Sequence, residues 1–90
     1  MAKIIYSNRF KKDVKLRQKQ GKDMNKLKAI FDIFIEDRPI PSKYKDHPLT
    51  GKWKGFRDLR IEPDWVLIYC VEKDVVYLSA TGSHSNLLKM

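Results

Sequence analysis

The chain has 90 residues, which suffice for one domain with a single hydrophobic core and are too few for two. Its one cysteine, Cys70, excludes an intramolecular disulfide. No apolar stretch approaches the ~20 residues that cross a bilayer, and no leader-like run follows Met1. These features predict a single cytoplasmic domain over residues 1–90.

The formal net charge is +8, and it is spread unevenly along the chain. Residues 1–30 hold ten Lys/Arg and two Asp, whereas residues 31–90 hold nine Lys/Arg and nine Asp/Glu. A basic excess confined to the first third indicates an anionic partner, such as nucleic acid, an acidic protein or a membrane surface. A solvated helix face would give the same charge, so both interpretations stay open.

The first half of the chain predicts a strand followed by a helical hairpin. Residues 3–6 are β-branched or aromatic in large part, as is typical of a strand. Ser7 or Asn8 then caps a helix that continues to about Gln20. Asp23 caps a second helix, whose apolar residues recur at helical spacing until shortly before the first proline.

The second half predicts three antiparallel strands, over 54–61, 65–71 and 75–79, with turns at 62–64 and 72–74. The middle strand is almost wholly apolar, as expected of a strand covered on both faces. The order is β-α-α-β-β-β with a short C-terminal helix. The predicted fold class is therefore α+β, an antiparallel sheet packed on a helical hairpin, with the other face open for a ligand.

The only side chains that titrate near neutral pH are two histidines. His47 lies in the proline-rich loop before the sheet, and His84 follows the last strand. Asp64 lies in the turn between the two middle strands, so the three side chains could meet at one end of the sheet. Each also has a purely structural interpretation, with His47 as a loop brace, Asp64 as a turn former and His84 as a helix cap.

Neither a metal nor another cofactor is expected. The sequence lacks paired-ligand spacings such as C-x-x-C or H-E-x-x-H, and it has no glycine-rich phosphate loop. Cys70 lies in an apolar strand and is expected to be a small core residue.

A basic domain whose open face carries His, Asp and Arg favours metal-independent cleavage of RNA. A base takes the proton of the 2′-hydroxyl, cations offset charge on the phosphate, and an acid protonates the leaving 5′-oxygen. Phe56 shares a predicted face with Lys54 and Arg60 and is the better base-stacking candidate. Trp65 is a second candidate, although packing in the core suits it better.

Four segments taken together resemble the YafQ toxins of the RelE/ParE superfamily of bacterial toxin–antitoxin systems. They are Tyr-Lys-Asp-His-Pro-Leu at 44–49, Gly-Lys-Trp-Lys-Gly-Phe-Arg-Asp at 51–58, Glu-Pro-Asp-Trp at 62–65 and Thr-Gly-Ser-His at 81–84. Each segment alone is weakly specific, but their order and spacing are compatible with the family over nearly the whole chain.

The resemblance implies a RelE-like fold and a ribosome-dependent endoribonuclease, an mRNA interferase that cuts mRNA in the decoding site of the 70S ribosome. It implies an acidic, DinJ-like antitoxin as partner, binding to operator DNA only through the antitoxin complex, and no membrane contact. Its catalytic residues map onto His47, Asp64 and His84, and Asp58 also falls at a position implicated in the family site. We expect His47 or Asp64 to be the base and His84 the acid.

Further roles are expected of cations outside this set. Arg60, Lys54 and Arg57 would offset the charge of the RNA phosphate. The exposed lysines of the first helix would contact the ribosome or the antitoxin; they are Lys11, Lys12 and Lys15.

Three positions depart from the family pattern. Arg60 stands where the YafQ pattern has a histidine, Ala80 where the family often has an arginine, and Leu88 where it has an aromatic residue. An arginine cannot act as a base at neutral pH but can neutralise a phosphate. We therefore expect Arg60 to supply the positive charge that is missing at Ala80.

Two other functions stay open. A ParE-like toxin shares the fold and targets gyrase, although the paired histidines and the Glu-Pro-Asp-Trp segment argue against it. A catalytically decayed module would bind the ribosome or the antitoxin without cutting, and Ala80 makes this conceivable.

Overall fold

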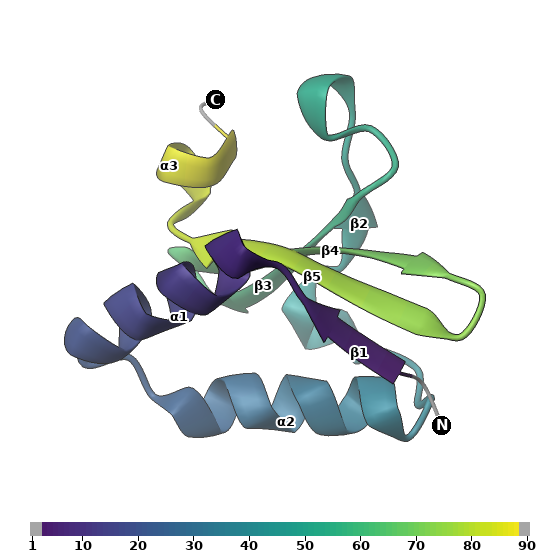
Figure 1. Cartoon of the computed structure of the whole chain (residues 1–90), viewed down its shortest axis with the longest axis horizontal. Helices are drawn as coiled ribbons and strands as arrows, with labels where there is room; N and C mark the ends of the chain where they lie inside the picture. The colour runs from purple at the N-terminus through teal and green to yellow at the C-terminus, as the bar shows by residue number, and fades with distance from the viewer. Residues whose placement is uncertain (1–2, 89–90) are drawn as a thin grey trace.

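The computed structural model describes residues 3–88, which form a five-stranded sheet with two helices beneath it (Figure 1). The strands are β1 (Lys3–Tyr6), β2 (His47–Pro48), β3 (Arg57–Glu62), β4 (Trp65–Glu72) and β5 (Val75–Gly82). The helices are α1 (Asn8–Lys19), α2 (Met24–Ile35) and α3 (His84–Leu88), with 3₁₀ turns η1 (Ser42–Tyr44) and η2 (Gly51–Trp53). None of the helices in this part of the chain has the length and apolar character that crossing a bilayer requires.

The strand order is β1-β5-β4-β3-β2. The neighbours β3–β4 and β4–β5 are antiparallel, as predicted. Strand β2 is antiparallel to β3, whereas β1 runs parallel to β5. The predicted strand over 54–61 begins only at Arg57, because η2 and a turn at Gly55, with φ of 94°, precede it. The two-residue strand β2 was not predicted, since a His-Pro pair in a proline-rich loop has no strand pattern.

The two long helices begin at the expected caps. The Ser7 hydroxyl accepts from the backbone N–H of Phe10 at 2.9 Å, and the Asp23 carboxylate accepts from that of Asn25 at 2.9 Å. The chain leaves α1 through Gly21, whose φ of 81° suits a glycine. Helices α1 and α2 then run in opposite directions on one side of the sheet (Figure 1).

The core lies between these helices and one face of the sheet. Alternate residues of β4, namely Trp65, Leu67 and Tyr69, point toward the helices and belong to this core. Their partners from the helices and neighbouring strands include Phe10, Leu27, Ile30, Phe34, Leu59 and Leu78. The other alternate residues of β4, Val66 and Ile68, are also fully buried, which confirms that the middle strand is covered on both faces.

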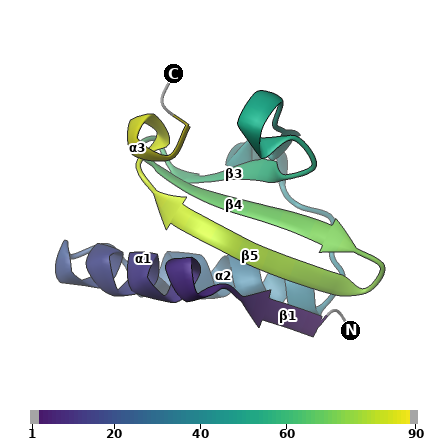
Figure 2. The ribbon, with the colours of Figure 1, turned by 45° about the horizontal axis from the view of Figure 1, so that its top comes forward.

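The second face of the sheet is covered at one end only. Helix α3 and the η2 segment, teal-green in Figure 2, rise on the side opposite α1 and α2. They are tied together because the Trp53 indole N–H donates to the Leu87 carbonyl at 3.3 Å. This arrangement leaves room beside α3 for the side chains of the candidate site.

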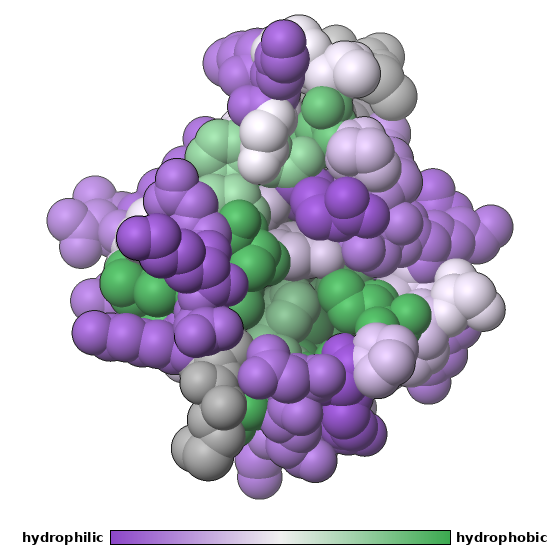
Figure 3. Space-filling view, turned by 90° about the vertical axis from the view of Figure 1, so that its right-hand side faces the viewer, coloured by the Kyte–Doolittle hydropathy of each residue, from purple (hydrophilic) through white to green (hydrophobic). Residues whose placement is uncertain are grey.

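The rest of that face is partly apolar. Cys70 is half-buried and lines a hollow of about 340 Å³ with Ile5, Phe56 and Tyr77, so it is not the core residue that the sequence predicted. Figure 3 shows apolar side chains gathered in a depression within a hydrophilic rim, on the side of the molecule at the right of Figure 1.

Candidate active site

A row of paired residues crosses four strands on the face away from α1 and α2. His47 of β2 lies opposite Asp58 of β3, Asp58 opposite Ile68 of β4, and Ile68 opposite Ala80 of β5. Directly opposed residues project to the same face of a sheet. The register therefore places the His47 imidazole beside the Asp58 carboxylate.

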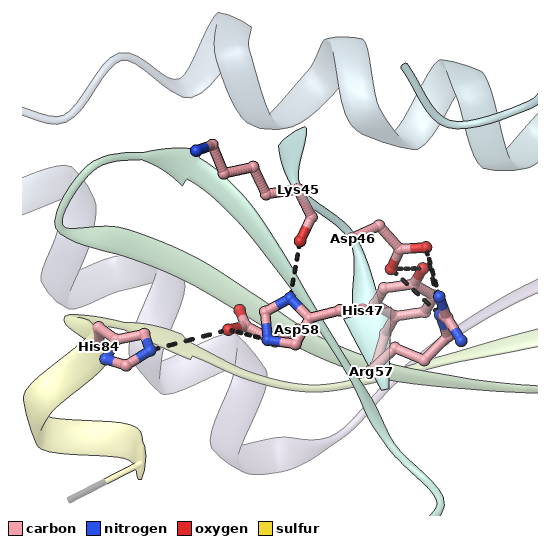
Figure 4. A network of polar contacts seen from close by, with 7 residues as sticks. Lys45, Asp46, His47, Arg57, Asp58 and His84 are labelled. Carbon is pink, nitrogen blue, oxygen red and sulfur yellow. Dashed lines mark hydrogen bonds and ion pairs between the residues drawn. The ribbon is translucent and has the colours of Figure 1, made fainter. Parts of the chain in front are cut away.

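His84 reaches the same carboxylate from a different direction. It is the first residue of α3, which begins directly after β5. Its Nε2 lies 4.0 Å from Asp58 Oδ2, and the Nε2 of His47 lies 3.5 Å from that oxygen. Figure 4 shows both imidazoles turned toward Asp58. The site is thus one carboxylate between two imidazoles.

Asp58 is almost inaccessible to water, with 2% of its surface exposed. Its Oδ1 has no hydrogen-bond partner among the described residues. Burial raises the pKa of the Asp58 carboxyl above its ordinary value, because the charged form loses its hydration. The positive charges of both imidazoles and of Arg60 oppose this rise in pKa without cancelling it.

The His47 ring is held by the backbone of its own loop. Its Nδ1 lies 2.7 Å from the Lys45 carbonyl oxygen. Because a carbonyl only accepts, Nδ1 carries a proton, and the neutral ring presents an unprotonated Nε2 to Asp58. That contact is favourable only when a proton lies on Nε2 of His47 or on the Asp58 carboxyl.

The carboxylate that the structure joins to both histidines is that of Asp58, and the convergence of Asp64 with them stays a prediction. Asp64 is exposed in the turn between β3 and β4, and no ion pair among residues 3–88 joins it to either imidazole. Asp58, and not Asp64, is therefore the carboxylate that lies between the two imidazoles. Helix α3 is capped by Ser83 rather than by His84, since the Ser83 hydroxyl accepts from the Asn86 backbone N–H at 3.2 Å.

Trp65 cannot stack on a base, because it is fully buried and donates its indole N–H to the Thr81 hydroxyl at 2.8 Å. Phe56 is half-buried, meets Trp53 edge-on at 5.5 Å between ring centroids, and borders the hollow described above. Of the two stacking candidates, only Phe56 thus has an accessible ring.

Arg57 points away from the site. Its guanidinium pairs with Asp46 at 3.0 Å, so the predicted contact with a phosphate is not the one this side chain makes. Arg60 is half-buried and lies on the same face of β3 as Asp58, two residues further on. Lys54 is exposed just after η2, and Ala80 is fully buried in the row.

The remaining predicted residues lie elsewhere. Lys11, Lys12 and Lys15 are exposed on α1, which is on the opposite side of the sheet from His47 and Asp58. Leu88 is the last residue of α3, and its side chain lies outside the described residues. Within residues 3–88, no group of three His, Cys, Asp or Glu is arranged to hold a metal ion.

Two residues near the site were missed in the sequence. Asp46 precedes His47, and Tyr69 donates its hydroxyl to the Asp46 carboxylate. The signal in the sequence was Tyr69, the one phenol in the apolar strand β4. A buried hydroxyl needs a hydrogen-bond partner, so Tyr69 indicated a polar residue nearby.

The sheet order, the helical hairpin and the site at its far face define a protein of the RelE-like fold class. The family of YafQ toxins of bacterial type II toxin–antitoxin systems matches residues 2–89, and the chain belongs to this family.

Individual relatives agree with this assignment. The mRNA interferase toxin YafQ of Escherichia coli (strain K12) is 51% identical over 85 residues, which cover 93% of this chain and 92% of the relative. The crystal structure of YafQ from E. coli strain BL21(DE3) has a TM-score of 0.91 at 48% identity, covering 97% of this chain and 98% of that one. The E. coli DinJ–YafQ complex contains a chain with a TM-score of 0.88 at 49% identity, with the same coverage.

Proposed function

We propose that this protein is a toxin that cleaves mRNA as an endoribonuclease and that a DinJ-like antitoxin neutralises it. Family membership supports the toxin role, and the names of the relatives support the substrate and the partner. The observation that carries the catalytic part is the buried Asp58 carboxylate, with its Oδ2 at 3.5 Å and 4.0 Å from two imidazoles.

The proposed reaction is a metal-independent transfer within the RNA backbone. Nε2 of His47 takes the proton of a 2′-hydroxyl, and the 2′-oxygen attacks the adjacent phosphorus. The bond to the 5′-oxygen breaks, and that oxygen takes a proton from protonated His84. The products are a 2′,3′-cyclic phosphate and a 5′-hydroxyl. During the reaction His47 gains a proton and His84 loses one. The Asp58 carboxylate stabilises the imidazole that is protonated, so its own buried charge keeps a cationic partner throughout.

Accessory side chains complete this proposal. Arg60 lies on the site face and would offset the charge that grows on the phosphate, as expected from its substitution for the family histidine. Lys54 is exposed and the Phe56 ring is accessible, and these side chains would bind the backbone and stack on a base of the mRNA. Ribosome dependence, cleavage in the decoding site and operator binding through the antitoxin complex are part of the proposal through the family resemblance.

The test is primer extension on a defined mRNA, with and without ribosomes. Wild-type protein should cut only when ribosomes are present, and His84→Ala should cut about 10²–10⁴-fold more slowly, because the acid is lost. Lys28→Ala, which removes an exposed cation of α2, is the matched control and should behave as wild type. Wild-type rates in His84→Ala would refute the assigned site.

The same experiment separates the alternatives. A decayed module, suggested by Ala80 in place of a cation, would bind ribosomes and leave the mRNA intact. A ParE-like toxin would arrest DNA replication before translation in expressing cells, whereas the proposed function stops translation first.

A further inference from the structure

We propose that Asp46, Arg57 and Tyr69 form a clamp that positions His47 from the opposite face of the sheet. None of the three touches the reacting groups, so they act as positioning residues. The effect on cleavage rests on the proposed function, whereas the effect on the His47 ring does not. Figure 4 shows Asp46 and Arg57 on the far side of His47 from Asp58.

The Asp46 carboxylate is held by two donors at once. The Arg57 guanidinium donates from Nη2 to Oδ2 at 3.0 Å and from Nε to both oxygens at 3.2 Å. The Tyr69 hydroxyl donates to Oδ1. The Asp46 side chain is 16% exposed, so these charge-assisted bonds are shielded from water.

The two donors reach Asp46 because of the sheet register. Arg57 of β3 lies directly opposite Tyr69 of β4, so their side chains project to the same face. Asp46 comes one residue before His47, and consecutive residues of an extended chain point to opposite faces. The clamp therefore lies on the helix side of the sheet while His47 lies on the site side.

Tyr69 anchors the clamp in the core. It is 2% exposed, and its ring contacts that of Phe34 from α2 at 5.0 Å between centroids. Burial raises the pKa of the Tyr69 hydroxyl, and the bond to Asp46 adds to the rise, so the hydroxyl remains a donor at any pH of interest.

The loop needs such an anchor because its backbone pairing is minimal. β2 has only two residues, and one of them, Pro48, has no N–H to donate. Lys45 has a left-handed φ of 51°, and its carbonyl accepts from His47 Nδ1. Asp46 lies between these two residues, so holding its side chain fixes both the carbonyl and the ring. The consequence is a fixed tautomer, with Nε2 facing Asp58.

The test removes one hydroxyl and keeps the ring. Tyr69→Phe retains the contact with Phe34 but leaves Asp46 with one donor. We expect the ¹⁵N chemical shifts of the His47 ring to lose the single Nδ1–H tautomer of the wild type, and cleavage to fall about ten- to hundredfold. Tyr6→Phe removes a hydroxyl from β1 at the other edge of the sheet and should change neither quantity.

A double-mutant cycle distinguishes positioning from general destabilisation. In a His47→Ala background, Tyr69→Phe should cost no further cleavage, because the side chain that it positions is gone. Equal losses of cleavage in both backgrounds would overturn the proposal. Unchanged ring shifts in Tyr69→Phe would overturn it as well, even if the wild type cleaved no RNA.

A second variant covers the case in which Tyr69→Phe does not fold. Arg57→Gln removes the charged donor from a side chain that is 39% exposed, so the core is untouched. It should give the same loss of the Nδ1–H tautomer. A wild-type His47 spectrum in Arg57→Gln would show that the ring is oriented without the clamp.

Discussion

Asp58 holds an ionisable carboxyl between His47 and the fully buried Ile68 in the row of paired residues. A lone buried charge is costly, and this cost explains both the raised pKa and the placement of two imidazoles beside one oxygen. The charge state of Asp58 therefore depends on that of its neighbours.

Replacing Asp58 with asparagine should reduce activity and alter the pH dependence of stability. The folded-state pKa of Asp58 lies above the unfolded one, so the folded state binds more protons and the carboxyl reduces the free energy of unfolding as pH rises from about 4. Urea unfolding from pH 4 to 7 should therefore show Asp58→Asn gaining stability relative to wild type as pH rises. Cleavage should fall at least about tenfold.

A difference in unfolding free energy that does not change with pH would contradict the raised pKa. Asp74→Asn, at the exposed turn between β4 and β5, is the matched control for loss of one carboxylate.

Arg60 carries a prediction of its own. Arg60→Ala should slow cleavage by about tenfold or more, because it removes the guanidinium charge that acts on Asp58. Arg60→Lys keeps the charge and should retain much of the rate. Single-turnover cleavage measures both variants. Full activity in Arg60→Ala would refute the hypothesis that Arg60 supplies the positive charge missing at Ala80.

At the scale of elements, α1 differs from the rest of the fold. It buries mainly Phe10 and Arg17, while its lysines face solvent and Leu16 remains 48% exposed. Helix α1 lies on the opposite side of the sheet from α3, although its Arg9 guanidinium lies 5.9 Å from the centroid of the Trp53 ring. Its surface is available for a partner.

Reversing the charge of Lys11, Lys12 and Lys15 should weaken binding to ribosomes without altering the fold, since glutamate suits a helix as well as lysine does. If each lysine contacts a phosphate, the slope of log affinity against log salt should become shallower by about 2 to 3. Sedimentation with ribosomes over a salt series measures this slope. The control variant reverses three other exposed lysines, Lys28, Lys43 and Lys73. Undiminished binding and toxicity would exclude a ribosomal role for α1.

Much of the fold could be predicted because its signals are local. The caps at Ser7 and Asp23 and the apolar run of β4 appear where the sequence places them. The site could be predicted only in part, because its geometry is set by register. The family resemblance implicated Asp58, but strand alternation alone gives no sign that it is buried or paired with His47 and Ile68.

Across the whole molecule, the sheet separates two surfaces of different character. The histidines and Asp58 lie on one side with α3, and the basic helix α1 lies on the other (Figure 2). Tyr69 and the clamp connect these sides through the sheet, from Phe34 of α2 to the loop of His47. The residues that hold the His47 loop are therefore anchored directly in the hydrophobic core.

The parallel pairing of β1 with β5 also bears on how the protein is made. Ser7 donates to the carbonyl of Ser79, 72 residues further along the chain, so the strand that is synthesised first binds one that is synthesised near the end. Translation proceeds from the N-terminus, and a growing polypeptide lacks both this pairing and His84 until its last segment has emerged. The sheet and the two-histidine site are therefore complete only after β5 and α3 have been synthesised.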